Sequence, residues 1–133
     1  MITKINHIGI VVKNLGLSTE IFDKLFNQNS PEIEAVSEQQ ANIAFYPVGQ
    51  SSIELIESTS KDSTISKFIE KRGEGIHHLC LEVENIREEM NRLKNLDFQF
   101  INEHPTDGGD GFLVAFIHPK SANGVLIELA QKK

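Results

Sequence analysis

Cysteine is scarce in this sequence of 133 residues and occurs once, at Cys80. A single cysteine cannot form an intramolecular disulfide bond, so the chain lacks the signature of small secreted domains. No apolar run approaches the roughly 18 residues that a membrane-spanning helix needs. The first residues show neither the apolar core nor the small-residue cleavage site of a signal peptide. From these absences we expect a cytoplasmic protein without membrane contacts.

A surplus of positive charge is also missing. Lysine and arginine total 13 against 19 aspartates and glutamates, which gives a formal net charge of −6. The chain therefore lacks the basic excess with which proteins neutralise nucleic-acid phosphates, which argues against nonspecific nucleic-acid binding. A local basic patch around a ligand phosphate stays open. Hydrophobic residues make up 39% and charged residues 24%, a balance typical of a folded globular domain. The length fits one domain over residues 1–133, with roughly two-thirds of the unfolded surface buried.

The two halves of the sequence share short segments in the same order. Three short segments recur in the same order, and they are Ile5–Leu15 with Ile76–Ile86, Ala44-Phe45 with Ala115-Phe116, and Ile53–Leu55 with Ile127–Leu129. The copies are 71 residues apart at His7 and His78, and 74 apart at Glu54 and Glu128. This period is too long for a solenoid repeat. We therefore expect two copies of one supersecondary module, about 1–58 and 76–133.

Each copy has the pattern of a β-α-β-β-β module, and the fold class expected is α+β. Alternating, β-branched-rich segments predict strands, and apolar residues at helical spacing predict helices. The expected elements are strands 4–12, 32–38, 41–48 and 51–58 with helix 17–26 in the first copy, and strands 76–83, 98–103, 112–118 and 124–130 with helix 86–95 in the second. A linking helix is expected at 61–71, with its apolar residues Ile65, Phe68 and Ile69 facing inward, and ends at Gly73 and Gly75. The apolar stripe expected for helix 86–95 is Ile86, Met90, Leu93 and Leu96. Residues 107–111 are glycine-rich and predict a flexible loop.

Four polar residues on the expected strands form the candidate metal site. Each copy contributes one histidine from its first strand and one glutamate from its last, and the four are His7, Glu54, His78 and Glu128. A lone histidine or glutamate on a strand is usually structural or solvated, but the recurrence of both types at matching places favours a shared site. A buried carboxylate is costly unless it is paired or binds a metal. Two imidazoles and two carboxylates suit one divalent cation, with Zn, Fe, Co, Ni and Mn all compatible.

Other reactive side chains have simpler interpretations. Cys80 is expected to be a small wall residue, because nothing around it suggests an activated thiolate. His104 and His118 have no counterpart in the first copy and are interpreted as surface residues, although a ligand contact by His118 stays open. The charged run from Glu82 to Lys94 is interpreted as a solvated helix face.

Several segments resemble the vicinal oxygen chelate superfamily (glyoxalase, bleomycin resistance protein and dioxygenase relatives) and, within it, the methylmalonyl-CoA epimerases. The segments are Asn6–Val12, Ala44–Gly49, Ile53–Glu57, Phe68–His78, Phe116–Ser121 and Gly124–Leu129. The resemblance covers nearly the whole chain. It implies two βαβββ modules forming a cupped, half-open barrel, commonly in a homodimer, with one divalent metal ion, cobalt by family analogy.

The resemblance also implies a reaction. The four residues of the candidate site fall on the family's ligand positions, where the place of Glu54 accepts Gln or Glu. The family inverts the α-carbon of an acyl-CoA through an enolate, and Glu128 is the implied base. Some members carry a second acid/base glutamate on the strand before the Ala-Phe pair, and the alignment places Asn42 there. Glu34 or Glu38, a water molecule, or a different substrate are the open explanations.

Two other functions on this scaffold remain open. One is another metal-dependent isomerase or lyase such as glyoxalase I, which acts on a thiol adduct. The other is a non-catalytic small-molecule-binding relative, which often lacks the ligand set. An extradiol dioxygenase is disfavoured, because those sites use two histidines and one carboxylate with open positions, and Glu54 would occupy a fourth.

Overall fold

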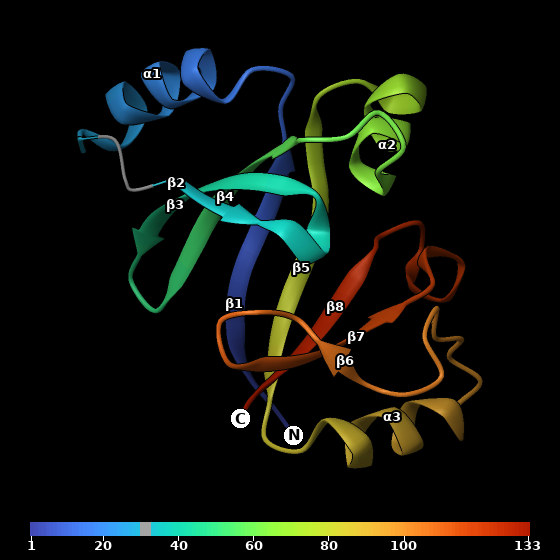
Figure 1. The fold of residues 1–133 in the computed structure, drawn as a ribbon. Coiled ribbons are helices and arrows are strands. Elements are labelled where there is room, and N and C mark those ends of the chain that lie inside the picture. The colour runs from blue at the N-terminus through green and yellow to red at the C-terminus, as the bar shows by residue number, and fades with distance from the viewer. Residues whose placement is uncertain (30–32) are drawn as a thin grey trace. The chain divides into compact units, whose positions relative to one another are not determined.

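The computed structural model describes residues 1–29 and 33–133, and Figure 1 shows its elements along the chain. In order they are β1 (Ile2–Val11), α1 (Leu15–Phe26), β2 (Ile33–Val36), a short 3-10 helix (Ser37–Gln39), β3 (Ala41–Val48), β4 (Ser51–Ser58), α2 (Thr64–Arg72), β5 (Gly75–Val83), α3 (Ile86–Lys94), β6 (Thr106–Asp107), β7 (Phe112–Ile117), a second 3-10 helix (Pro119–Ala122) and β8 (Ile127–Lys132). The α+β class and the doubled β-α-β-β-β order are confirmed. Residue 32 of the expected strand 32–38 lies outside the described residues.

The chain forms two compact units that cut across the sequence repeat. The first compact unit comprises Met1–His7 and His78–Lys133, and the second comprises Ile8–His77. Neighbouring strands run β1-β5-β8-β7-β6 in the first unit and β2-β3-β4-β1 in the second. The start of β1 joins the first unit through the Glu84 N–H, which donates to the Met1 carbonyl at 3.2 Å. The opening strand of one sequence copy therefore lies beside the opening strand of the other. The prediction of a single domain stays a prediction.

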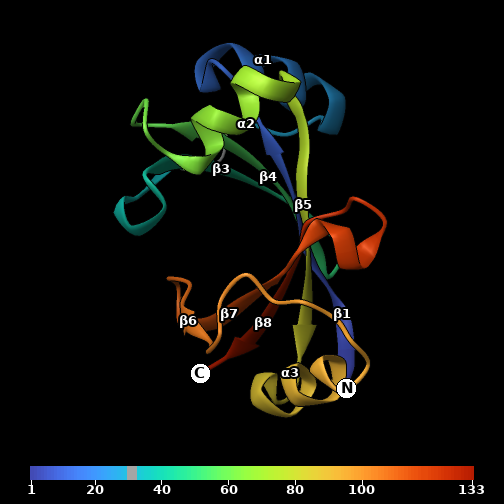
Figure 2. The same ribbon diagram turned by 90° about the vertical axis from the view of Figure 1, so that its right-hand side faces the viewer.

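In the first compact unit, α3 covers one face of the sheet, and a second, smaller apolar cluster lies on the other face. The core under α3 contains Ile86, Met90 and Leu93 of the helix packed on Ala115 and Leu129 of the strands. A second apolar cluster combines buried and half-buried side chains on the opposite face, and its members are Cys80, Val114, Ala130, Phe112 and Phe116. Side chains alternate along a strand, so Glu128 points to this second face. Figure 2 shows β6, β7 and β8 side by side in this unit.

In the second compact unit, helices pack on both faces of β3 and β4. Phe22 and Phe26 of α1 pack against Tyr46 and Leu55. On the other face, Ile65 of α2 packs in a cluster with Ile43 and Ile56 of the strands, and Phe68 and Ile69 lie against it. The inward orientation expected for the apolar residues of the linking helix is thus confirmed. Because Phe45 pairs with Glu54 and Ile43 with Ile56, Glu54 lies on the α2 face.

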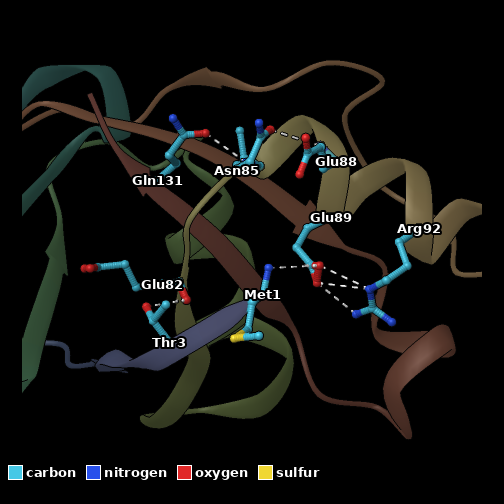
Figure 3. Close-up of polar contacts among 9 residues, drawn as sticks. Met1, Thr3, Glu82, Asn85, Glu88, Glu89, Arg92 and Gln131 are labelled. Carbon is cyan, nitrogen blue, oxygen red and sulfur yellow. Dashed lines mark hydrogen bonds and ion pairs between the residues drawn. The ribbon is translucent and has the colours of Figure 1, made fainter.

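Helix α1 of the first sequence copy and helix α3 of the second begin in the same way. Asn14 caps α1 by accepting from the Leu17 N–H at 3.0 Å, and Asn85 caps α3 by accepting from the Glu88 N–H at 3.1 Å. The first backbone N–H of each helix, that of Leu15 in α1 and of Ile86 in α3, donates at 2.8 Å to a side chain on the last strand of the same sequence copy. The acceptors are Glu57 and Gln131. Figure 3 shows the α3 pair. These bonds satisfy donors that have no partner inside the helix.

Three sequence expectations differ from the structure. Residues 98–103 contain no named strand, only an isolated bridge between Phe100 and Ile117. The reason is local, because the Asn102 side chain accepts from the Phe116 N–H at 2.8 Å in place of a backbone partner. Leu96, expected on the apolar stripe of α3, is exposed. The final strand begins at Ile127 rather than 124, because Asn123 and Gly124 have positive φ and end the preceding turn.

The glycine-rich segment 107–111 is a hydrogen-bonded turn. The Gly108 N–H donates to the Phe112 carbonyl at 2.9 Å, and the Gly109 N–H donates to an Asp107 carboxylate oxygen at 3.1 Å. Lys133 Nζ lies 3.1 Å from the same carboxylate oxygen. The segment expected to be a flexible loop is therefore held by two hydrogen bonds and one ion pair at Asp107, Gly108 and Gly109.

Within residues 1–29 and 33–133, every helix is too short or too polar to cross a membrane.

Candidate metal centre

Three of the four expected ligands meet in the first compact unit. His7 projects from β1, His78 from β5 and Glu128 from β8. The two imidazole Nε2 atoms are 2.9 Å apart. The Glu128 Oε1 atom lies 3.2 Å from Nε2 of His78 and 3.5 Å from Nε2 of His7. The structure therefore brings together side chains that are up to 121 positions apart in the sequence.

Strand register explains the convergence. β5 and β8 run parallel with Cys80 opposite Glu128, and β7 and β8 run antiparallel with Phe116 opposite Glu128. Directly opposite residues share a face of the sheet, so Glu128 stands between Cys80 and Phe116. His78 is two residues before Cys80 and shares that face. The His78 and Phe116 rings meet edge to face with centroids 6.5 Å apart, which holds the imidazole over the sheet.

The site is buried, and its carboxylate is ionised. His7, His78 and Glu128 are each less than a tenth exposed. Burial by itself raises the pKa of the Glu128 carboxyl, but hydrogen bonds and positive charge from His7 and His78 outweigh it and lower the pKa from 4.5 to about 2. A buried carboxylate beside two imidazoles thus keeps its charge at neutral pH, as a metal ligand or a proton acceptor must.

The donor set fits a divalent cation. Ligands at right angles on bonds of about 2.1 Å lie about 3 Å from one another, and the three observed separations are 2.9, 3.2 and 3.5 Å. Nitrogen, nitrogen and oxygen donors suit the borderline first-row metals more than magnesium or calcium. Three donor atoms that are crowded together and buried require a proton or a cation between them.

Cys80 is a further donor atom at this place. Its sulfur lies within 4.8 Å of the donor atoms of His7 and Glu128. Cys80 is therefore a candidate donor atom beside His7 and Glu128. Cys80 is fully buried among apolar side chains, in agreement with its interpretation as a wall residue.

Glu54 lies on β4 in the second compact unit, and its role as the fourth ligand stays a prediction. Its side chain is buried, which is unusual for a glutamate and requires a partner. It shares the α2 face of the sheet with Ile43 and Phe45.

The expectation for Asn42 needs correction. Asn42 pairs with Glu57 on β4 and with Ala35 on β2, so it lies on the α1 face, opposite to Glu54. The β3 residue that precedes Ala44 on the Glu54 face is Ile43, which is buried. The neighbour of Ile43 on β2 is Glu34. The register therefore places Glu34, and not Asn42, on the face that carries Glu54.

The interpretation of Glu82 to Lys94 as a solvated helix face is wrong at two positions. Glu82 lies on β5, where its carboxylate accepts from Asn6 Nδ2 at 3.0 Å. Glu89 is buried and ion-paired with Arg92 at 2.9 Å. Figure 3 shows Glu89 between Arg92 and the Met1 ammonium, which lies 3.6 Å away. Periodicity alone could not distinguish these residues from the solvated ones beside them.

Asn6 and His118 have roles that sequence reasoning missed. The Asn6 Oδ1 atom lies 2.7 Å from Nδ1 of His7. Its position directly before a candidate ligand was the only available signal. His118 caps the second 3-10 helix, since its Nδ1 accepts from the Lys120 N–H at 3.1 Å. That bond gives His118 a structural role.

Comparison with known proteins agrees with this geometry. A profile of the Glyoxalase/Bleomycin resistance protein/Dioxygenase superfamily matches residues 6–116. The ethylmalonyl-CoA/methylmalonyl-CoA epimerase of Cereibacter sphaeroides is 32% identical over 133 aligned residues, covering 98% of this chain and 99% of that protein. The human mitochondrial methylmalonyl-CoA epimerase is 31% identical, covering 96% of this chain and 73% of that protein.

Solved structures give the same result. A variant of the Streptomyces coelicolor methylmalonyl-CoA epimerase, in complex with 2-nitronate-propionyl-CoA, superposes with a TM-score of 0.89 and 27% identity. The superposition covers 99% of both chains. The methylmalonyl-CoA epimerase of Mycobacterium tuberculosis superposes with a TM-score of 0.90 and 30% identity over 99% of this chain and 89% of that one.

Proposed function

The chain belongs to the glyoxalase/bleomycin resistance protein/dioxygenase superfamily, and on that premise we propose that it is a metal-dependent methylmalonyl-CoA epimerase. The single observation that carries the chemistry is the convergence of two imidazoles and an ionised carboxylate in a buried site. Relatives that match this chain along nearly its whole length are epimerases of methylmalonyl-CoA, which supports the choice of substrate.

The proposed ligands are His7, Glu54, His78 and Glu128. The histidines offer neutral Nε2 atoms and the glutamates offer carboxylate oxygens, a set compatible with Co, Zn, Ni, Mn or Fe. A bound divalent cation supplies a Lewis acid that stabilises negative charge on the thioester oxygen and acidifies the α-carbon. Cobalt is the metal we propose by family analogy.

Glu128 is the proposed proton acceptor. Its carboxylate is buried and ionised, so it is ready to take a proton without first losing one. The apolar side chains of Val114, Ala130 and Phe116 on the same face exclude water, which protects a carbanionic α-carbon from uncontrolled protonation.

Inversion needs a second proton donor on the other side of the α-carbon, and we propose Glu34 for it. Of the alternatives left open by the sequence, only Glu34 is placed by strand register on the face that carries Glu54. Glu38 lies in the 3-10 helix beyond β2. Asn42 points to the α1 face and could not shuttle a proton in any case.

The test follows inversion and isotope exchange together. Metal-loaded protein is incubated with one epimer of methylmalonyl-CoA in deuterated water, and both the appearance of the other epimer and α-deuterium uptake are measured. We expect rapid inversion that chelation and Glu128→Gln each abolish, while Glu103→Gln, an exposed control, leaves it unchanged. Glu34→Gln should retain exchange and lose most inversion, whereas Glu38→Gln should behave as wild type.

Two outcomes would contradict the proposal. If neither inversion nor exchange occurs while a glutathione–methylglyoxal adduct turns over, the protein is a glyoxalase-type lyase. If Glu34→Gln inverts at the wild-type rate, then a water molecule or another residue is the second donor, and the role of Glu34 fails while the epimerase assignment stands.

The proposed partners are an acyl-CoA substrate and a second copy of the chain in a homodimer, in the cytoplasm. The solved complexes of relatives with acyl-CoA ligands support the first. An exposed apolar stripe on α1, formed by Leu17, Ile21 and Leu25, is compatible with the second. Light scattering of the purified protein measures the mass, and a monomeric mass at micromolar concentration would exclude the dimer.

A further inference from the structure

The hydrogen bonds behind His7 determine which of its nitrogens faces the site. Nδ1 of His7 lies 2.7 Å from Asn6 Oδ1, and Nδ2 of the same amide donates to Glu82 Oε1 at 3.0 Å. Lys4 Nζ lies 3.9 Å from that carboxylate oxygen. All four residues belong to the first compact unit.

The chemistry of these groups permits a single direction for the chain of bonds. An ionised carboxylate accepts hydrogen bonds and donates none, so the amide nitrogen of Asn6 must face Glu82. The amide oxygen then faces His7, and because that oxygen is also only an acceptor, Nδ1 of His7 must carry the proton. In the neutral imidazole, which is the form that binds a metal, Nε2 is then left with its lone pair. This is the atom 2.9 Å from Nε2 of His78 and 3.5 Å from Glu128.

We propose that Asn6 and Glu82 are positioning residues of the metal centre, with Glu82 orienting the Asn6 amide and Asn6 fixing the tautomer and ring plane of His7. This inference rests on the metal site proposed above. It goes beyond that site by naming two residues that are not themselves metal ligands. A histidine ligand held by a hydrogen bond on its far nitrogen is a better and more selective donor.

The second sequence copy carries a different residue at the matching position. The residue before His78 is His77, whose ring packs edge to face on Phe68 with centroids 4.8 Å apart. The asparagine that contacts His7 is therefore not repeated before His78, although the two strands are repeats of each other.

The test measures metal affinity and His7 protonation, and not turnover. Co²⁺ affinity is measured by competition with a chelator for wild type, Asn6→Ala, Asn6→Asp, Glu82→Gln and the double variant Asn6→Asp/Glu82→Gln. The imidazole tautomers of the metal-free proteins are read by nitrogen-15 NMR. Glu84→Gln is the matched control, because Glu84 is an exposed neighbour just beyond β5.

Asn6→Ala should weaken Co²⁺ binding by roughly 10- to 100-fold and give His7 a mixture of tautomers. Asn6→Asp alone should also weaken binding, because it sets one carboxylate against the Glu82 carboxylate. The double variant reverses the bond between positions 6 and 82: the new amide donates to the new carboxylate, which still accepts from His7. Its affinity should recover well above that of Asn6→Asp, which a merely structural role of either side chain would not produce. Glu82→Gln alone should lose only a few-fold.

The inference is overturned if Asn6→Ala binds Co²⁺ as wild type does with a single His7 tautomer, or if the double variant binds no better than Asn6→Asp. If wild type and His7→Ala bind Co²⁺ equally, the metal site itself is wrong, and the inference falls with it. Loss of epimerase activity in a protein that still shows the double-variant recovery would instead reject only the proposed reaction.

Discussion

At the scale of single residues, each candidate metal ligand is supported by a different observation. His7, His78 and Glu128 are fixed by three short distances. Glu54 is a candidate because its side chain is buried, and Cys80 because its sulfur lies within 4.8 Å of the donor atoms of His7 and Glu128. Each can be tested by removing its donor atom.

Glu54 is expected to behave as a metal ligand. Glu54→Gln keeps one coordinating oxygen and loses a negative charge, so the protein should still bind a divalent cation, but more weakly. Glu54→Ala removes the oxygen and should weaken binding by more than about tenfold, or 1.4 kcal/mol. Competition titration measures both, with exposed Glu70→Gln as control. Unchanged affinity in Glu54→Ala would reduce the ligand set to three residues.

Cys80 is expected to stay outside the coordination sphere. Thiolate bound to Co²⁺ gives an intense near-ultraviolet charge-transfer band, and we expect the Co²⁺-loaded protein to lack it. Cys80→Ala should leave the absorption spectrum unchanged while creating a small cavity among the apolar neighbours of Cys80 that costs about 1 kcal/mol. A band that disappears in Cys80→Ala would show that the sulfur is a ligand.

At the scale of elements, the repeated helices are stabilised where they begin. Asn85→Ala removes the cap that accepts from the Glu88 N–H, and we expect a loss of about 1 kcal/mol in the free energy of unfolding. Asn91→Ala, on the exposed side of the same helix, is the control and should be neutral or slightly stabilising. Urea unfolding compares the two, and equal stabilities would mean that the cap contributes nothing.

Glu89 makes the stability of α3 depend on pH. The hydrogen bond from Arg92 is the main cause that lowers its pKa below 4.5, against the opposing effect of burial. A carboxylate with a lowered folded-state pKa contributes stability that is fully present above the unfolded value of about 4.5 and is lost as the pH falls through the folded value.

Glu89→Gln should therefore destabilise the protein by roughly 1–2 kcal/mol at pH 7, and the difference from wild type should shrink below about pH 4.5. Unfolding curves between pH 3 and pH 7 measure it. Exposed Glu88→Gln on the same turn should stay within about 0.5 kcal/mol of wild type. A difference that is constant over this range would show that the charge of Glu89 is not responsible.

At the scale of the whole molecule, metal binding should be coupled to folding. Three of the proposed ligands, His7, His78 and Glu128, come from β1, β5 and β8, which assemble only in the folded chain. A cation at 100 times its Kd should raise the free energy of unfolding by about 2.7 kcal/mol. Thermal unfolding with and without chelator measures the shift, and Glu128→Gln should reduce it strongly. A melting temperature that is insensitive to metal in the wild type would contradict a site built by the fold.

Much of this fold was predictable because its determinants are local or repeated. The alternation of β1, the helical spacing around Phe22 and Met90, and the recurrence of His7 as His78 all lie within short windows of sequence. The helix caps Asn14 and Asn85 belong to the same class, since a cap acts within one turn.

The failures have equally specific causes. Segment 98–103 has the composition of a strand, but Asn102 occupies the backbone donor that a strand would use. Half of the apolar residues of α1 face solvent, because Leu15, Phe22 and Phe26 are the ones that pack on the cluster around Tyr46 and Leu55. A hydrophobic pattern shows which residues can be buried, and only packing decides which are.

By itself, the sequence determined the doubled module, the α+β class and the side chains able to bind a cation, since these follow from periodicity and repetition. The tertiary structure decided how those side chains are used. Strand register put Glu34 rather than Asn42 on the face of Glu54, and pairing of β1 with β5 set Asn6 beside Glu82. The physical reason is that a one-residue change of register moves every side chain of a strand to the other face, and no local pattern contains that information.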